Sequence, residues 1–200
     1  MSDVNDVSGV SGVSDVSDGD DPTGVRAELL RQIRDKAVVH GRVTLSSGIE
    51  ADFYIDLRRI TLDGTAAPLA GQVMLDVTAD LEYDAVGGLT LGADPVATSM
   101  LHAAAARGRS LDAFVVRKAG KAHGLQQRIE GPSIAGRRVL IVEDTTTTGN
   151  SPLTAVEAAR EAGAEVVAVA SIVERGAAGA MREAGLPYLY PYDLSDLGLG

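Results

Sequence analysis

The sequence predicts an α/β domain with a central, mainly parallel sheet that is flanked by helices. Two observations carry this prediction. First, the segments that read as strands are largely continuous apolar runs, which is typical of parallel strands buried on both faces, and they cover residues 84–90, 111–116, 138–142 and 165–173. Second, segments with apolar residues at helical spacing separate these runs. In such sheets a ligand binds beyond the carboxyl ends of the strands, so we expect the functional residues in the loops that follow them.

The elements before this alternating region form a smaller unit. Thr23 precedes apolar residues that are spaced for one face of a helix, and this helix is predicted to end at Gly41. Two short strand-like runs follow, at residues 42–45 and 53–57. The turn-rich sequence between them predicts a β-hairpin.

The remaining helices alternate with the four strands. They are predicted at residues 68–81, 95–107, 152–162 and 177–184, and a short tyrosine-bearing strand is expected near Leu189. Residues 118–132 are predicted to form a loop. The predicted helices place His40 at a helix end and His102 within a helix. Neither histidine has a metal-ligand partner four residues further along the chain.

The composition describes one cytoplasmic domain. The chain has 200 residues, of which 45% are hydrophobic, and no cysteine, which excludes disulfides, a thiolate nucleophile and cysteine-bound metal. Its net charge of −10 opposes binding to nucleic acid or to an anionic membrane. No apolar run is long enough to span a bilayer, and the N-terminus is acidic where a signal peptide is basic and then apolar. We therefore expect a cytoplasmic protein whose partners include neither nucleic acid nor membrane.

The acidic charge is concentrated at the N-terminus. Residues 1–22 contain six of the 28 acidic residues and no basic residue, and their repeated Val, Ser, Gly and Asp offer too little apolar surface to fold. We expect a disordered acidic tail at 1–22 and a single domain at 23–200. The chain also has only three lysines beside fifteen arginines and eighteen aspartates, which indicates a salt-adapted, halophilic source.

The most specific motif is VLIVEDTTTTGNS, at residues 139–151. Hydroxyls, backbone N–H groups and the positive end of the following helix would converge there, as binding of a phosphate monoester requires. Glu143 and Asp144 suit a different group, because carboxylates repel phosphate but accept hydrogen bonds from vicinal sugar hydroxyls. The motif therefore predicts a ribose phosphate site, and the alternative is an ordinary strand-to-helix turn with a Thr or Ser cap. Neither a Walker loop nor a GxGxxG fingerprint is present.

A second motif, VVRKAGKAHGLQQRIEG at residues 115–131, holds four potential cations within seven residues: Arg117, Lys118, Lys121 and His123. Two of the three lysines of the chain lie in it. A glycine-bearing cationic loop suits a polyanionic ligand and would neutralise a leaving diphosphate. The alternative is a solvated basic surface loop.

These motifs resemble those of a known family. The acidic pair and the hydroxyl-rich loop resemble the diphosphoribose-binding signature of type I phosphoribosyltransferases, and RKAGKAHG at residues 117–124 looks like the mobile catalytic loop of the orotate phosphoribosyltransferases among them. Three further segments are similar to the N-terminal hairpin, the diphosphate loop and the base-contacting strand end of that family: SSGIEADFYIDLRR (46–59), LTLGADPVA (89–97) and SIVERG (171–176). The resemblance covers residues 25–192 and implies a type I phosphoribosyltransferase-like fold with a small N-terminal helix and hairpin as a hood.

The resemblance also implies a reaction and a set of site residues. The family transfers the ribose 5-phosphate of 5-phospho-α-D-ribose 1-diphosphate (PRPP) to orotate, which gives orotidine 5′-phosphate and diphosphate in pyrimidine biosynthesis. The implied catalytic residues are Lys121, Glu143 and Asp144. The implied PRPP contacts are the cationic positions Arg117, Lys118, Lys121 and His123, together with Glu143, Asp144, Thr145, Thr146, Thr147, Thr148, Gly149, Asn150 and Ser151. The implied orotate contacts are Phe53, Tyr54, Thr147 and Arg175.

A cofactor and an assembly follow from the same resemblance. Mg²⁺ is implied as the cofactor, and it would be held through the substrate diphosphate rather than by a dedicated set of protein ligands. A homodimer that shares the catalytic loop across its interface is implied as well. One position departs from the family pattern, because Ser46 stands where many bacterial relatives have a hairpin lysine that touches orotate. What takes over that contact stays open.

Two alternatives share parts of this pattern. A phosphoribosyltransferase for another nucleobase would have the same PRPP half, but Arg175 weighs against it, since hypoxanthine or uracil would leave a buried guanidinium unpaired where orotate offers a carboxylate. A transcriptional regulator that senses PRPP would need a DNA-binding module, for which the acidic residues 1–22 leave no room.

Overall fold

The computed structural model describes residues 22–44, 50–118 and 128–200. The predicted tail up to Asp21, the hairpin position Ser46 and two of the predicted cations, Lys121 and His123, lie outside the described residues. No helix within these ranges is both long and apolar enough to cross a membrane.

The predicted sheet is confirmed. Six strands form it in the order β5-β4-β3-β6-β7-β8, and every neighbouring pair is parallel except β4 and β5. Their bounds are Ala85–Leu89 for β3, Asp112–Val116 for β4, Ile129–Glu130 for β5, Arg138–Thr146 for β6, Glu165–Glu174 for β7 and Tyr188–Leu189 for β8. The four predicted apolar runs are thus β3, β4, β6 and β7, at the centre of the sheet.

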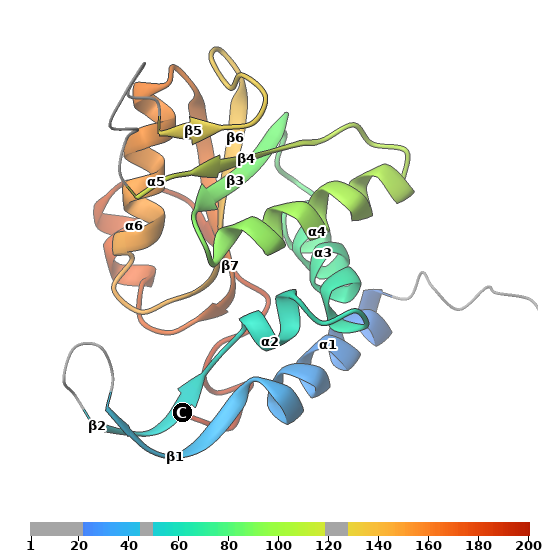
Figure 1. Cartoon of the computed structure of the whole chain (residues 1–200), viewed down its shortest axis with the longest axis vertical. Helices are drawn as coiled ribbons and strands as arrows, with labels where there is room; N and C mark the ends of the chain where they lie inside the picture. Colours follow the sequence, from blue (N-terminus) through green and yellow to red (C-terminus); the bar gives the residue numbers. More distant parts are fainter. Residues whose placement is uncertain (1–21, 45–49, 119–127) are drawn as a thin grey trace, which may run out of the picture.

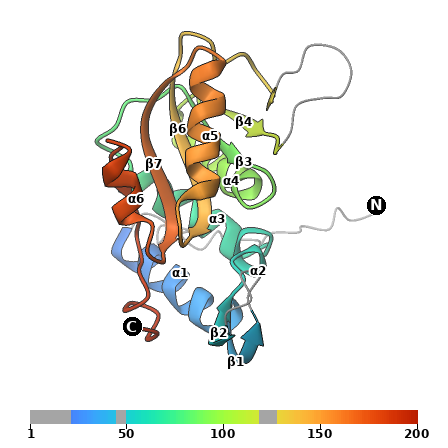
Figure 2. The same cartoon turned by 90° about the vertical axis from the view of Figure 1, so that its left-hand side faces the viewer.

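Helices cover both faces of this sheet (Figures 1 and 2). On one face lie α5 (Asn150–Glu161) and α6 (Ala178–Glu183), and on the other lie α3 (Ala66–Val77) and α4 (Ala93–Ala106). Successive residues of β6 point to opposite faces, so that Ile141 packs in the cluster with α5 while Leu140 and Val142 pack in the cluster with α3 and α4. This two-sided burial is why the central strands read as continuous apolar runs.

The N-terminal elements form a hood beyond one end of the sheet (Figure 1): α1 (Pro22–Lys36), β1 (Val38–Thr44), β2 (Glu50–Ile55) and α2 (Arg58–Thr61). The antiparallel pairing of β1 with β2 confirms the predicted hairpin. The prediction that the first helix continues to Gly41 was wrong, because β1 begins at Val38. Val38 and Val39 are β-branched and pair with Ile55 and Tyr54, which places His40 in a strand and not at a helix end.

Three further elements differ from the prediction. The loop predicted at 118–132 contains β5, which adds an antiparallel edge to β4. The strand predicted to end at Val142 continues to Thr146, because β7 pairs with it along this whole length. The short helix α2 had no periodic apolar signal, since four residues make little more than one turn. The extension of β6 matters most, because it fixes the acidic pair within a strand.

The C-terminal segment ties the hood to the rest of the domain. The Tyr192 hydroxyl donates to the Arg26 carbonyl at 2.6 Å, and the Arg34 Nε donates to the Asp196 carbonyl at 2.9 Å. Figure 2 shows the C-terminus beside α1. The C-terminal segment therefore holds α1, and with it the hood, against the rest of the domain.

Candidate active site

A cavity of about 340 Å³ lies between the hood and the carboxyl ends of the central strands. It combines residues from the hairpin and α2, from the segment after β3, from the end of β4, from β6 and from the turn after β7. Its lining residues are Tyr54, Ile55, Asp56, Leu57, Arg58, Leu89, Thr90, Leu91, Gly92, Lys118, Glu143, Asp144, Thr145, Ser151 and Arg175. The position is the one expected for the ligand of a parallel α/β sheet.

The acidic pair forms one wall of this cavity. Glu143 is only 5% exposed, and burial, reinforced by the charge of Asp144, raises its pKa from 4.5 to about 8. Burial also raises the pKa of Asp144. The Asp144 N–H donates to Glu143 Oε1 at 3.2 Å and the Thr145 N–H to Asp144 Oδ1 at 2.7 Å, which fixes both side chains. Two adjacent carboxyl groups that resist simultaneous ionisation are well suited to bind vicinal hydroxyls.

The segment after β3 packs directly on the acidic pair. A Cβ on Gly92 would lie 2.4 Å from Glu143 Oε1 and 2.9 Å from Asp144 Oδ1, so only glycine allows this approach. The Thr90 hydroxyl donates to Asp94 Oδ2 at 2.7 Å, and burial raises the pKa of Asp94. The resemblance identifies this segment as a diphosphate loop, and in the structure it lines the same cavity as the hairpin.

The hydroxyl-rich loop joins β6 to α5. Thr145 and Ser151 line the cavity, while the Thr146 Oγ1 is buried and accepts from the Gly149 N–H at 3.1 Å. Gly149 has a φ of 79°, the left-handed region that favours glycine, and it precedes the N-terminus of α5. The predicted contacts Thr147, Thr148 and Asn150 are exposed on this loop. Exposed hydroxyls beside a helix N-terminus are the arrangement that binds a phosphate.

Arg175 lines the same cavity. Its side chain is half-buried, and burial lowers its pKa. Its Nε is buried and has no hydrogen-bond partner among the described residues. A carboxylate ligand would provide the missing acceptor.

The turn that carries Arg175 is fixed by the preceding residue. The buried Glu174 carboxylate accepts from the backbone N–H groups of Gly176 at 2.6 Å, Ala177 at 3.3 Å and Ala178 at 2.9 Å. The Arg175 N–H donates to the Thr146 carbonyl at 3.2 Å, which joins this turn to the hydroxyl-rich loop. Glu174 is thus a positioning residue that the sequence analysis did not find.

The hairpin contributes Tyr54 but not Phe53. Alternation along β2 turns the two side chains to opposite sides, so that Tyr54 lines the cavity and Phe53 packs against the core. Arg58 of α2 also lines the cavity, and it was not among the predicted site residues. In the sequence, the only sign of Arg58 as a site residue is its position two residues after Asp56. An exposed ion pair on the surface gives the same pattern, so the sequence does not distinguish the two.

The cationic loop is described only at its two ends. Lys118 lines the cavity, whereas Arg117 makes an ion pair with Glu130 at 3.2 Å and does not line it. A larger cavity of about 520 Å³ lies between β5 and α5, and its lining includes none of the predicted site residues. Within the described ranges there is no group of three or more His, Asp or Glu side chains that could hold a metal ion.

Comparisons with known proteins match the fold and show the family. The family of the phosphoribosyl transferase domain matches residues 66–186. An orotate phosphoribosyltransferase of Streptomyces coelicolor is 76% identical over 180 residues, which are 88% of this chain and 99% of that protein. A crystal structure of Mycobacterium tuberculosis orotate phosphoribosyltransferase with Fe(III) dicitrate has a TM-score of 0.80 and 58% identity, over 88% of this chain and 99% of that chain. A structure of the M. tuberculosis enzyme in complex with PRPP has a TM-score of 0.77 at 53% identity, with the same coverage.

Proposed function

The chain belongs to the orotate phosphoribosyltransferase family, and on this premise we propose that the cavity between its hood and its sheet is the site of the family's reaction. The membership confirms the resemblance seen in the sequence. The enzyme transfers the ribose 5-phosphate of PRPP to orotate and releases diphosphate. The observation that carries the assignment of the site is that one cavity joins the acidic pair of Glu143 and Asp144 with Arg175, whose Nε lacks a partner among the described residues.

The acidic pair binds the ribose. Cleavage of the anomeric C–O bond builds positive charge on the ribose and negative charge on the leaving diphosphate, so the site needs acids at one end and cations at the other. Glu143 and Asp144 accept hydrogen bonds from the ribose hydroxyls and offset the developing positive charge. Neither acts as a covalent nucleophile.

The hydroxyl-rich loop binds the 5-phosphate. Its residues run from Thr145 to Ser151 and include the exposed side chains of Thr147, Thr148 and Asn150. Support comes from the converging hydroxyls and from their place at the N-terminus of α5, the positive end of that helix.

Cations bind the diphosphate. We assign this role to Arg117, Lys118, Lys121 and His123, with Lys121 as the principal catalytic cation. The position of Lys118 on the cavity supports it. The oxygen donors of the acidic pair also fit a Mg²⁺ ion that the substrate carries, because this hard cation prefers oxygen ligands and keeps most of its waters. When bound, that ion would neutralise part of the diphosphate charge, while Glu143 and Asp144 would hold the hydroxyls beside it.

Orotate lies at the end of the cavity formed by Arg175 and Tyr54. The guanidinium pairs with the orotate carboxylate, and Thr147 lies on the loop that the Arg175 backbone joins. Phe53 supports this end from the core side of β2 rather than from the cavity.

The assembly, location and salt adaptation of the enzyme form the rest of the proposal. We infer a homodimer in which the loop within residues 117–131 serves the partner's site. Because β5 pairs with β4 in the same chain, the part that would reach the partner lies between Lys118 and Arg128, where glycines stand at 120 and 124. The absence of cysteine supports a cytoplasmic location. The scarcity of lysine beside abundant aspartate supports a salt-adapted source.

One assay tests the proposed function. The purified chain is incubated with orotate, PRPP and Mg²⁺, and the loss of orotate absorbance is followed. We expect loss that requires both PRPP and Mg²⁺ and that falls strongly in the Asp144→Asn variant. A chain that turns over orotate equally well with Asn at position 144 would contradict the assignment of the site.

A further inference from the structure

Arg58 is a cation of the cavity that has no role in the assignments above. It is the first residue of α2, and its side chain lines the cavity together with the acidic pair and Arg175. Among the described residues, three side chains that carry positive charge line this cavity: Arg58, Lys118 and Arg175. The substrates are strongly anionic, so a cation in the wall of their site bears on binding.

Two neighbours hold the Arg58 guanidinium in place. Its Nε donates to Asp56 Oδ1 at 2.8 Å, and its Nη2 donates to the Tyr54 hydroxyl at 3.1 Å. Asp56 is in turn anchored, because its backbone N–H donates to the Ala37 carbonyl at 3.0 Å. A guanidinium has five N–H donors, so these two bonds leave three for a ligand. Arg58 is therefore pre-oriented without being saturated.

Arg58 and Arg175 both line the cavity and share two neighbours there, Tyr54 and Asp144. The pKa of the Arg58 guanidinium is raised, chiefly by its hydrogen bond to Asp56 and further by the charges of Asp56, Tyr54 and Asp144. Burial lowers the pKa of Arg175, and Tyr54 and Asp144 again act in the opposite direction. Both guanidiniums thus lie within electrostatic range of the same tyrosine and the same carboxylate.

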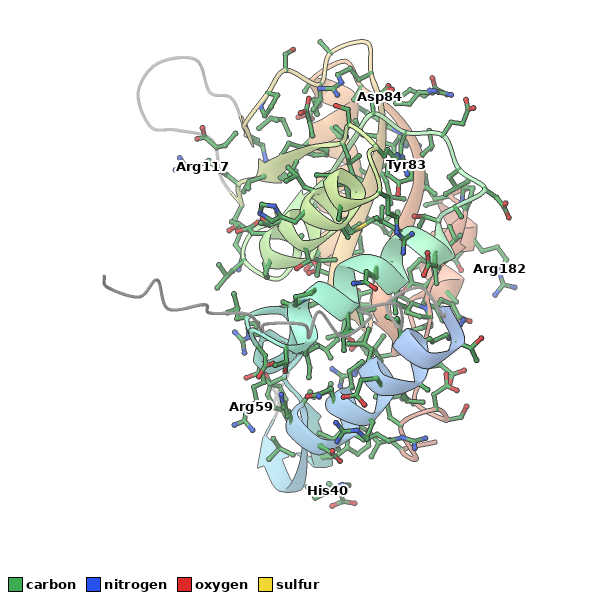
Figure 3. All side chains as sticks on the ribbon, turned by 90° about the vertical axis from the view of Figure 1, so that its right-hand side faces the viewer. His40, Arg59, Tyr83, Asp84, Arg117 and Arg182 are labelled. Atoms are coloured by element: carbon green, nitrogen blue, oxygen red, sulfur yellow. The ribbon has the colours of Figure 1, made fainter. Side chains whose placement is uncertain are left out.

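Arg59 provides the contrast within the same helix. It also reaches Asp56, at 4.0 Å, but it does not line the cavity. Its side chain is 57% exposed against 46% for Arg58, and it extends outward from α2 (Figure 3). The two neighbours share residue type, helix and ion-pair partner, and they differ in access to the cavity.

We propose that Arg58 is a specificity-determining residue that donates a hydrogen bond to an oxygen of orotate, alongside Arg175. Orotate offers a carboxylate and two ring carbonyls as acceptors, and a charge-assisted bond to any of them is stronger than a neutral one. Asp56 keeps the guanidinium in position while the cavity is empty, so little side-chain entropy is lost when orotate binds. The inference rests on the proposed assignment of Arg175 and Tyr54 to orotate binding. It gives the hood a cation that contacts orotate although residue 46 is a serine and not a lysine.

The test compares Arg58→Ala with the matched control Arg59→Ala and with Arg58→Lys. Initial rates are measured with orotate varied at saturating PRPP and with PRPP varied at saturating orotate. We expect Arg58→Ala to raise the KM for orotate about tenfold and to leave the KM for PRPP within about twofold, while Arg59→Ala changes neither by more than about twofold. Arg58→Lys keeps the charge but loses the forked donor geometry, so its KM for orotate should lie between those of wild type and Arg58→Ala.

A binding measurement separates a contact with the base from a general effect on the hood. Arg58→Ala should weaken the binding of orotidine 5′-phosphate by about tenfold. Uridine 5′-phosphate lacks the carboxylate. If the substitution weakens its binding less than that of orotidine 5′-phosphate, Arg58 contacts the carboxylate. If the binding of both nucleotides is weakened equally, Arg58 contacts a ring carbonyl. Either result supports the proposal. Unchanged binding of both nucleotides, a KM change that falls mainly on PRPP, or equal behaviour of the Arg58 and Arg59 variants would overturn it. If the wild-type chain turns over orotate, a negative result with Arg58→Ala overturns only the role of Arg58. If the wild-type chain does not turn over orotate, the proposed function is overturned as well.

Discussion

Replacement of Glu143 by glutamine should stabilise the folded chain at alkaline pH and at the same time impair catalysis. Glu143 is 5% exposed, and its pKa rises from 4.5 to about 8 on folding, chiefly because of burial. Between these two values the folded chain holds a proton that the unfolded chain has released. The free energy of unfolding of the wild type therefore falls as the pH rises through this window, and it stops falling above the folded pKa. Glutamine has no such proton to lose.

The size of the effect follows from the two pKa values. A tenfold change in the proton equilibrium corresponds to about 1.4 kcal/mol, so the wild type should lose up to about 4 kcal/mol relative to Glu143→Gln between about pH 5 and about pH 9. The shared titration with Asp144 makes this an upper limit. For a domain of this size, the corresponding difference in Tm is of order 10 °C.

Urea unfolding of both proteins at a series of pH values measures this effect. The free energy of unfolding of Glu143→Gln minus that of the wild type should grow with pH between about pH 5 and about pH 9. At the same time kcat/KM should fall about tenfold to a hundredfold, because an oxygen that accepts from the ribose hydroxyls is replaced by an amide nitrogen, which can only donate. Glu174→Gln is the control, since that buried carboxylate accepts three backbone N–H bonds and its replacement should destabilise the fold by about 1–3 kcal/mol. A difference between Glu143→Gln and wild type that does not change with pH would refute the reasoning.

Three further outcomes are expected. Lys121→Ala should lower kcat about a hundredfold or more and leave the KM for orotate within a few fold, because its charge meets the diphosphate mainly as that group departs; an unchanged kcat in steady-state assays would remove Lys121 from the catalytic set. Gly92→Ala, whose Cβ would lie 2.4 Å from Glu143 Oε1, should lower kcat/KM at least about tenfold, whereas Gly179→Ala, with nothing within 4 Å, should not; equal kinetics of the two variants would contradict the close approach. Reassorted subunits of the inactive variants Lys121→Ala and Asp144→Asn should regain about a quarter of wild-type activity if the loop serves the partner's site, and activity near zero in mixed dimers confirmed by mass would exclude sharing.

The sequence predicts the architecture well where burial imposes a simple pattern. The strands β3, β4, β6 and β7 lie between two helical layers, so their residues are apolar on both faces and are readable without a structure. The start of the hairpin is harder to predict from the sequence. Val38 and Val39 continue an apolar pattern that also suits a helix, and only their pairing with β2 decides in favour of a strand.

The candidate site divides in the same way. The acidic pair and the hydroxyl-rich loop are contiguous in the chain, so one motif revealed them together. Arg58 and Gly92 lie within the hairpin and diphosphate-loop segments that the resemblance identified, but their approach to the cavity and to the acidic pair is visible only in the structure. A motif search has no access to such contacts, since nothing in the local sequence separates Arg58 from its exposed neighbour Arg59. The same limit explains Phe53, which a resemblance placed beside Tyr54 but which the alternation of β2 turns toward the core.

The central claim is that one cavity binds PRPP at the acidic pair and orotate at Arg175, and the two KM values of paired variants test it most directly. Arg175→Ala should raise the KM for orotate at least about tenfold and change the KM for PRPP little, since a charge-assisted pair contributes about 1.5–3 kcal/mol. Asp144→Asn should show the reverse, with its larger effect on PRPP. If both variants raise both KM values by the same factor, the two residues do not divide the substrates between them, and the assignment of the cavity is contradicted.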